Sequence, residues 1–205
     1  MEARAPWPHS RAMKHTTLCL IALAALASPL AAQTRLTINL YDSTTLRASD
    51  RQAMKQETSK ILQQAGLEVE WVECELAGQP LNQPECARPL GAGRLMLQLA
   101  PGSNKKNAKA TGMALIQPGL SVFACLYPDR VKDLAKDANW DFAELLGHAA
   151  AHELGHLLLE SNNHSPAGIM RARWETSDLR LLSHSGLIFL SGQLDSLRTL
   201  TSSSR

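Results

Sequence analysis

Residues 148–170 read HAAAHELGHLLLESNNHSPAGIM, and they hold four of the chain's seven histidines. His152 and His156 are four residues apart, which on an α-helix places both imidazoles on one face, one turn from each other. Two histidines arranged in this way can occupy adjacent positions around one zinc ion. Glu153 completes an H-E-x-x-H arrangement, in which the carboxylate is the general base for a zinc-activated water. The segment therefore predicts a hydrolytic zinc site on a helix.

Two histidines leave such a site incomplete, because a catalytic zinc usually takes three protein ligands and keeps a fourth position for water. We expect His164 to be the third ligand, since residues 161–163 (Ser-Asn-Asn) can end the helix and turn the chain back. Glu160 is the alternative, one turn beyond His156 on the same helix face. His148 lies two turns from His156, about 12 Å along the helix axis. One ion cannot span that distance, so we expect His148 to support the site or to fill space beside it.

These residues resemble the metzincin clan of zinc metallopeptidases. The family pattern is H-E-x-x-H-x-x-G-x-x-H followed by a Met-turn, a tight turn whose methionine lies beneath the zinc ligands. The resemblance implies three zinc ligands, one general base and one Met-turn methionine, which by position are His152, His156 and His164, then Glu153, then Met170. It implies a zincin-like fold, zinc as the metal, and a peptide or protein substrate.

The chain departs from the family pattern at two positions. Leu159 occupies the place of the family's glycine, and Asn162 that of its third histidine. His164 therefore needs a connection two residues longer than the family's. Met170 also fits simple core filling, the commoner role of methionine, although the small residues that precede it favour a turn.

The rest of the chain predicts an α+β fold, with a mixed twisted β-sheet, a long active-site helix and a helical, loop-rich C-terminal part. Alternating apolar residues and turn signals indicate strands at residues 35–41, 67–72, 94–99, 113–116 and 121–126. Helices are expected at residues 50–64, 129–136, 142–161 and 192–197, with Ser49 or Asp50 capping the first and Asp141 the third. We expect Ser103–Lys109 to be a solvated loop and the tail 200–205 to be frayed.

The first 32 residues have the layout of a secretory signal peptide. Three basic residues precede an apolar run at 18–27, and small residues follow it. The run is too short for a membrane span, which needs roughly 20 apolar residues. Cleavage after Ala32 or after Ala27 and a start at Met1 or Met13 all fit this pattern. We expect residues 33–205 to form one zincin-like domain that is secreted or periplasmic, without a membrane span once the signal is removed.

Three cysteines remain after the signal peptide, and export would place them in an oxidising compartment. Cys74 and Cys86 flank Glu75–Glu85, so we predict a disulfide that closes this loop and contributes roughly 3 kcal/mol. Cys125 lies in an apolar run and is expected to be a buried thiol.

Composition excludes several other kinds of protein. The 205 residues are 44% apolar and 20% charged with a net charge of +2, so a disordered chain is excluded. The chain lacks the clustered excess of basic residues that nucleic-acid binding usually shows. Aromatic residues make up only 4% of it, which argues against a base-stacking or carbohydrate-binding surface.

The function that these observations favour is that of a secreted zinc-dependent endopeptidase. The resemblance implies that a substrate pairs as an extended strand with a sheet edge, for which Met113–Ile116 is the candidate. Arg171, Arg173 and Trp174 indicate either an acidic substrate preference or a solvated surface. One alternative is a catalytically silent zincin domain that binds zinc for structure or partner recognition, and another is a metal-binding or adhesion module. The sequence leaves the oligomeric state open.

Overall fold

A computed structural model describes residues 34–91, 93–102, 110–117, 119–175, 177–178 and 187–203. These residues all lie within one unit of the fold, residues 33–205. The predicted signal peptide and the predicted loop Ser103–Lys109 lie outside the described residues. Within the described chain, no helix has the length and apolar character needed to cross a membrane.

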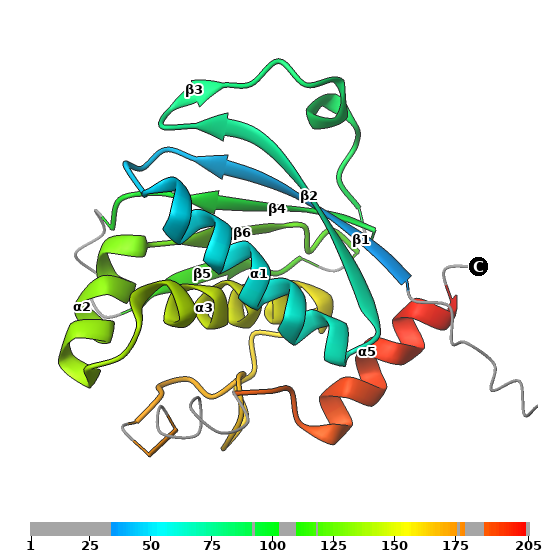
Figure 1. Ribbon diagram of the computed structural model, residues 1–205. Helices are drawn as coiled ribbons and strands as arrows, with labels where there is room; N and C mark the ends of the chain where they lie inside the picture. Colours follow the sequence, from blue (N-terminus) through cyan, green and yellow to red (C-terminus); the bar gives the residue numbers. More distant parts are fainter. Residues whose placement is uncertain are drawn as a thin grey trace, which may run out of the picture. The chain divides into compact units, whose positions relative to one another are not determined.

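Helices and strands follow the predicted order, with short additions between the two cysteines of the predicted disulfide (Figure 1). In chain order the elements are β1 (Thr34–Asp42), α1 (Ala48–Gln64), β2 (Leu67–Leu76), β3 (Gln79–Pro80), the 3₁₀ helix η1 (Pro84–Ala87), β4 (Arg94–Leu99), β5 (Gly112–Leu115), β6 (Phe123–Leu126), α2 (Pro128–Ala138), α3 (Phe142–Leu158) and α5 (Ser191–Ser203). The strand β3 lies within the predicted loop Glu75–Glu85, and η1 begins in that loop and ends just beyond Cys86.

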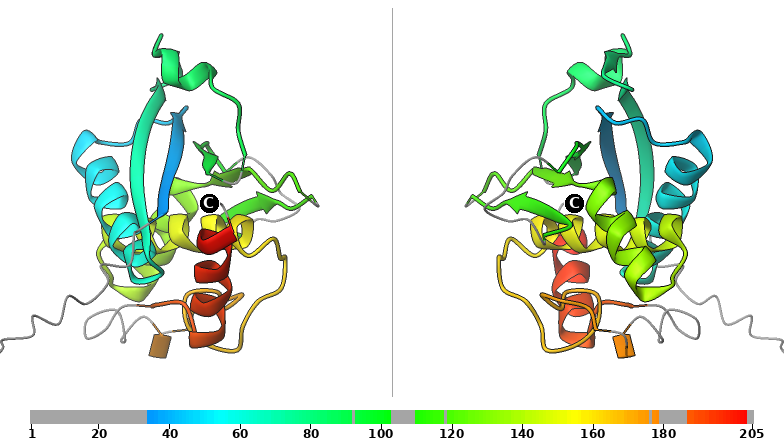
Figure 2. Two further views of the ribbon diagram at one scale, coloured as in Figure 1. Left: turned by 90° about the vertical axis from the view of Figure 1, so that its right-hand side faces the viewer. Right: turned by 90° about the vertical axis from the view of Figure 1, so that its left-hand side faces the viewer.

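The strands form one six-stranded sheet in the order β3-β2-β1-β4-β6-β5. The pairs β1–β2, β1–β4 and β4–β6 are parallel, whereas β2–β3 and β5–β6 are antiparallel. This mixed sheet confirms the predicted α+β class. Figure 2 shows α1 on one side of β1 and β2, with the loop that follows β3 on the other side. The strand β5 lies at one edge of the sheet and contains most of Met113–Ile116, the segment expected to be the substrate-binding edge.

The core lies between the sheet and the helices. Leu36, Ile38 and Leu40 of β1 are at most 2% exposed, and they belong to the same buried cluster as Leu146 and Leu154 of α3. The period of two in β1 therefore directs every second side chain toward the helices, as predicted. This packing places the long helix α3 against the sheet.

A close approach between α1 and α3 fixes the position of α3 further. The hydroxyl of Thr58 in α1 lies 2.8 Å from the Met54 carbonyl oxygen of its own helix and 3.1 Å from the Gly147 carbonyl oxygen of α3, so its hydrogen is shared between the two acceptors. A Cβ at Gly147 would lie 2.6 Å from the Cβ of Glu57, so only glycine permits this spacing. The two helices therefore pack closely about one turn before the predicted metal ligands.

Of the two predicted helix N-caps, one is confirmed and the other is wrong. Asp141 caps α3 as predicted, because its carboxylate accepts a hydrogen bond from the Glu144 backbone N–H at 2.8 Å. The cap predicted for α1 at Ser49 or Asp50 is wrong, since Arg47 is the N-cap residue and α1 begins at Ala48. The Asp50 carboxylate binds the Arg47 guanidinium at 2.8 Å instead of the backbone N–H groups that a cap would satisfy.

Three element ends also differ from the predicted ends by three residues or more. The strand β2 continues to Leu76, where it pairs with β1 and β3. The helix α5 extends to Ser203, so most of the segment expected to be a frayed tail is helical. The helix α3 ends at Leu158, three residues before the predicted end at Ser161, because the chain reverses at Glu160, which has a φ of 45°.

The structure joins Cys74 of β2 and Cys86 of η1 by a disulfide. This bond ties the loop after β2 to the sheet. Cys125 of β6 is a free, buried cysteine, as expected.

Candidate metal centre

The central residues of the site lie on α3. His152 and His156 are 9% and 5% exposed, and their Nε2 atoms lie 3.1 Å apart. The four-residue spacing produces this arrangement, because side chains at i and i+4 lie above one another on a helix. The helix therefore presents two imidazole nitrogens to one point.

His164 joins this pair because the end of α3 reverses the chain. The N–H of Ser161 donates to the carbonyl of His156 at 3.1 Å, and the N–H of Glu160 donates to the carbonyl of Leu157 at 3.2 Å. This pair of bonds is the Schellman motif, which requires a left-handed residue that is usually glycine. Here Glu160 adopts that conformation, with a φ of 45°.

The reversal brings one ligand atom from each of the three histidines within 4.8 Å of the other two. Glu160 is exposed and is not a member of this group. Of the two candidates for a third ligand, the structure brings His164 to the pair and uses Glu160 as the turn residue.

Backbone carbonyls orient both helical histidines. The Nδ1 atom of His152 bonds to the carbonyl of Ile169, and that of His156 to the carbonyl of Ser161, each at 2.7 Å. A carbonyl only accepts hydrogen bonds, so each Nδ1 is the donor and each Nε2 keeps its lone pair. Burial lowers the pKa of His152 to about 4 and lowers that of His156 as well, so both rings are neutral near pH 7.

The donor set fits zinc. Three imidazoles with a free fourth position are the ligand set of a catalytic zinc site. Carbonyl acceptors on the opposite ring nitrogens are the usual outer partners of such ligands. Within the described ranges, this is the one group of three or more His, Cys, Asp or Glu side chains close enough to share an ion. The chain therefore holds a group able to bind zinc.

Glu153 lies between α3 and the edge strand β5. It is 6% exposed, and a Cβ at Gly112 of β5 would lie 2.6 Å from its Cγ and 2.7 Å from its Oε1. Glycine at position 112 thus allows the carboxylate to lie against the strand. Burial raises the pKa of Glu153 to about 8, and a cation held by the histidines would act in the opposite sense by favouring the carboxylate.

Met170 packs against the same helix. It is fully buried, and the hydrogen bond from the Ser165 N–H to its carbonyl, at 2.8 Å, closes the turn before it. A Cβ at Gly155 would lie 2.6 Å from the Met170 Sδ and 2.8 Å from the Phe189 ring. Methionine and α3 are therefore in direct contact one residue before His156.

This contact predicts that Gly155→Ala destabilises the metal-free protein by about 1–2 kcal/mol, because the cost of overpacking exceeds the gain in helix propensity. Chemical denaturation measures the difference. The matched control is Gly192→Ala in α5, where nothing lies within 4 Å of an added Cβ. We expect that control to be neutral or stabilising. Equal stability of both variants would show that the contact between α3 and Met170 is not tight.

His148 lies away from the three-histidine group and faces α1. It is fully buried, its Nδ1 donates to the Glu144 carbonyl at 3.0 Å, and its Nε2 lies 3.8 Å from Glu57. Burial lowers its pKa. The structure thus places His148 in the interface between α1 and α3.

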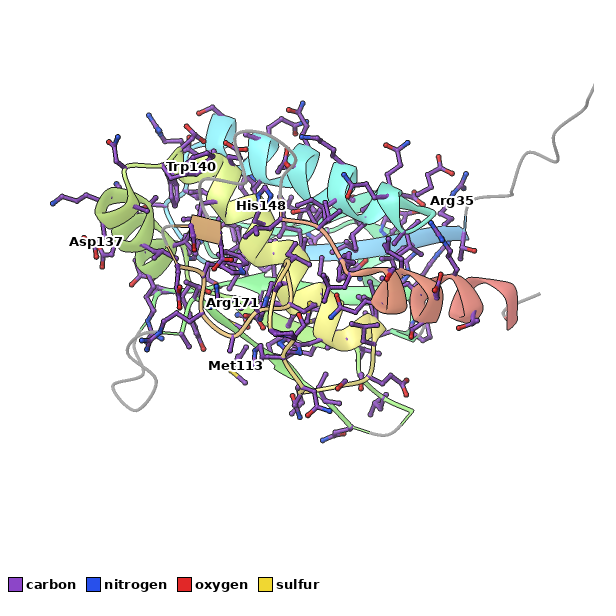
Figure 3. All side chains as sticks on the ribbon, turned by 90° about the horizontal axis from the view of Figure 1, so that it is seen from below. Arg35, Met113, Asp137, Trp140, His148 and Arg171 are labelled. Atoms are coloured by element: carbon purple, nitrogen blue, oxygen red, sulfur yellow. A yellow bond between two sulfur atoms is a disulfide. The ribbon has the colours of Figure 1, made fainter. Side chains whose placement is uncertain are left out.

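A cavity of about 560 Å³ adjoins His152. One wall comes from the loop after Met170 and the other from α2, with residues before β5 at one end. Its lining residues are Ala110, Thr111, Arg130, Asp133, Leu134, Asp137, His152, Arg171, Ala172, Arg173 and Trp174. Figure 3 shows Asp137 on α2 and Arg171 on the loop beyond α3.

The sequence analysis did not identify the residues of α2 as part of this cavity. Arg130, Asp133, Leu134 and Asp137 recur at helical spacing and so share one face of α2, which the sequence does reveal. Nothing local indicates that this face lies opposite His152.

The cavity arginines differ in their pairing. Arg171 is bound to Asp178 at 2.5 Å and to Glu175 at 3.0 Å. Arg130 stacks on the Tyr127 ring, 4.5 Å from its centroid, and donates to the Ala110 carbonyl. Arg171 is therefore held in ion pairs with two carboxylates.

Two solved metallopeptidase structures have a fold similar to that of this chain. A zinc-dependent peptidase from Methanocorpusculum labreanum matches with a TM-score of 0.54 and 17% identity, over 78% of this chain and 99% of that one. Metalloproteinase-II from Bacteroides fragilis matches with a TM-score of 0.53 and 12% identity, over 82% of this chain and 53% of that one, so this chain spans about half of its length. Archaemetzincin from Methanopyrus kandleri has a TM-score of 0.47 and 15% identity, over 85% of this chain and 99% of that one. No protein-family model and no curated protein matches the sequence.

At 17% and 12% identity, the first two matches establish a shared fold. Both of those proteins are metallopeptidases by name, in agreement with the zincin-like fold that the metzincin resemblance implies. The chain therefore has the fold of zincin-type metallopeptidases, and within that fold it gathers three histidines that can bind zinc.

Proposed function

We propose that the protein is an exported zinc-dependent metallopeptidase that hydrolyses peptide bonds, with Glu153 as general base. The observation that carries this proposal is the grouping of His152, His156 and His164 within 4.8 Å, with Glu153 next to the first ligand. The shared fold supports it. A purely structural zinc site has no need of a buried carboxylate at that position.

The roles of the chain's residues follow from their positions. The three histidines would hold the metal, and zinc bound there would supply a Lewis acid that activates water and polarises the scissile carbonyl. Glu153 would accept the proton of the attacking water and pass it to the leaving amine. The carbonyls of Ile169 and Ser161 would keep the two helical imidazoles in the orientation that ligation requires.

The edge strand β5 would bind the substrate backbone. The Tyr127 N–H donates to the Thr111 carbonyl at 2.8 Å, and hydrogen-bonded pairs alternate along an antiparallel ladder. Gly112 and Ala114 therefore direct their N–H and C=O groups away from β6, toward the open edge. Glu153 lies against Gly112, so a peptide paired with this edge would pass beside the general base.

Ala114→Pro tests this pairing, because proline removes the outward N–H without breaking a β5–β6 hydrogen bond. We expect kcat/KM for an extended peptide to fall at least about fivefold, since one hydrogen bond contributes about 1 kcal/mol. Ala114→Val keeps the N–H and serves as the matched control. Steady-state kinetics with both variants measure the effect, and unchanged kinetics of Ala114→Pro would remove β5 from substrate binding.

Export is part of the proposal. The basic and apolar layout of residues 1–32 supports a signal peptide. The Cys74–Cys86 disulfide supports an oxidising compartment. N-terminal sequencing of the protein recovered outside the cytoplasm would test it, with cleavage after Ala32 or Ala27 as the expected result.

A combined measurement of zinc content and cleavage separates the proposal from a silent zincin domain. We expect one zinc per chain and cleavage of a mixed peptide library that stops when a chelator is added and returns with zinc. One equivalent of bound zinc with no peptide cleaved would instead favour a structural or partner-binding domain.

A further inference from the structure

The carbonyl of Ile169 accepts hydrogen bonds from two side chains. The Nδ1 of His152 donates at 2.7 Å, and the indole N–H of Trp174 donates at 3.2 Å. The two rings meet edge to face, with centroids 5.8 Å apart and planes at 86°. One acceptor thus links a member of the three-histidine group to a tryptophan four residues beyond Met170.

The segment that carries this carbonyl is held in place on both sides. The Ile169 N–H donates to the Ile188 carbonyl at 2.9 Å, and the Arg171 N–H donates to the Gly168 carbonyl at 3.2 Å. The guanidinium of Arg171 is in turn tied to Asp178 and Glu175. Ile169 itself is fully buried. The burial and the hydrogen bonds on both sides together restrict the direction of its carbonyl.

We infer that Trp174 is a positioning residue for His152. A carbonyl oxygen has two lone pairs, and here both have donors, so no water can compete with His152 for this acceptor. The device holds the proton on Nδ1 and leaves Nε2 free for the metal.

Trp174 also lies where a substrate could reach it. Trp174 lines the 560 Å³ cavity beside His152. A substrate side chain that enters the cavity would therefore touch the residue that orients a metal ligand. This inference rests on the proposed metal site.

Trp174→Phe is the decisive variant, because it keeps an aromatic ring and removes the indole N–H. The matched control is Trp71→Phe, since the Trp71 indole N–H also donates to an oxygen, that of Ser59 at 2.9 Å, but between α1 and β2. We expect the zinc Kd, measured by competition with a chelator, to rise about tenfold in Trp174→Phe, the lower end of the range for outer partners of metal ligands. Trp71→Phe should retain the wild-type Kd.

A second readout separates positioning from a loss of stability. Long-range ¹H–¹⁵N NMR of the metal-free protein reports which nitrogen of His152 carries the proton. We expect the proton on Nδ1 in the wild type and in Trp71→Phe, and a mixture of both tautomers in Trp174→Phe. Wild-type zinc affinity and a wild-type tautomer in Trp174→Phe would overturn the inference and leave the metal site standing. A wild-type protein that binds no zinc would overturn both.

Discussion

Glu153→Gln is expected to abolish peptide hydrolysis while zinc binding stays intact. The carboxylate lies beside the first ligand and against Gly112 of the edge strand, where a substrate carbonyl and the attacking water would meet. Glutamine has nearly the same shape but cannot accept the proton, so we expect kcat to fall roughly 10²–10⁴-fold. Peptide cleavage and metal content, measured on the same sample, give the result.

The control for this substitution lies on the same helix. Glu144 of α3 is partly buried, and its carboxylate accepts a hydrogen bond from the Trp140 indole at 3.1 Å, away from the three histidines. Glu144→Gln makes the same chemical change and should leave cleavage unaltered. Cleavage retained by Glu153→Gln would exclude Glu153 as the base, and the catalytic proposal would then need another proton acceptor.

His164→Ala is expected to remove most of the zinc affinity. The histidine is exposed, but its ligand atom lies within 4.8 Å of those of His152 and His156. Because a ligand contributes more than its outer partners do, we expect the zinc Kd to rise by more than the roughly 10–100-fold that loss of an outer partner costs. Competition with a chelator of known affinity measures this change.

Glu160→Gly is the matched comparison for His164→Ala. It removes the alternative carboxylate and places glycine where the backbone has a φ of 45°. Glycine suits that conformation, so the chain reversal should persist and zinc affinity should remain at the wild-type level. If Glu160→Gly loses zinc and His164→Ala retains it, the two residues have the opposite roles, and the third ligand is the carboxylate.

Sequence reasoning predicted the order of helices and strands because that order depends on local patterns. Alternation directs Leu36, Ile38 and Leu40 inward, and Asp141 stands where a helix needs an acceptor for its first N–H groups. The same reasoning erred at Asp50, because a neighbouring guanidinium competes with the backbone for the carboxylate. It also placed the end of α3 too late, since a glutamate rarely adopts the left-handed conformation that Glu160 has.

The sequence by itself determined that His152 and His156 share one helix face with Glu153 beside them, since helix periodicity depends only on spacing. Only the tertiary structure decided that His164 completes the group and that the Ile169 carbonyl orients His152. Only it placed the α2 wall across the cavity. These features join residues from different elements, and their distances are set by the reversal at Glu160 and by packing between helices, which spacing along the chain does not encode.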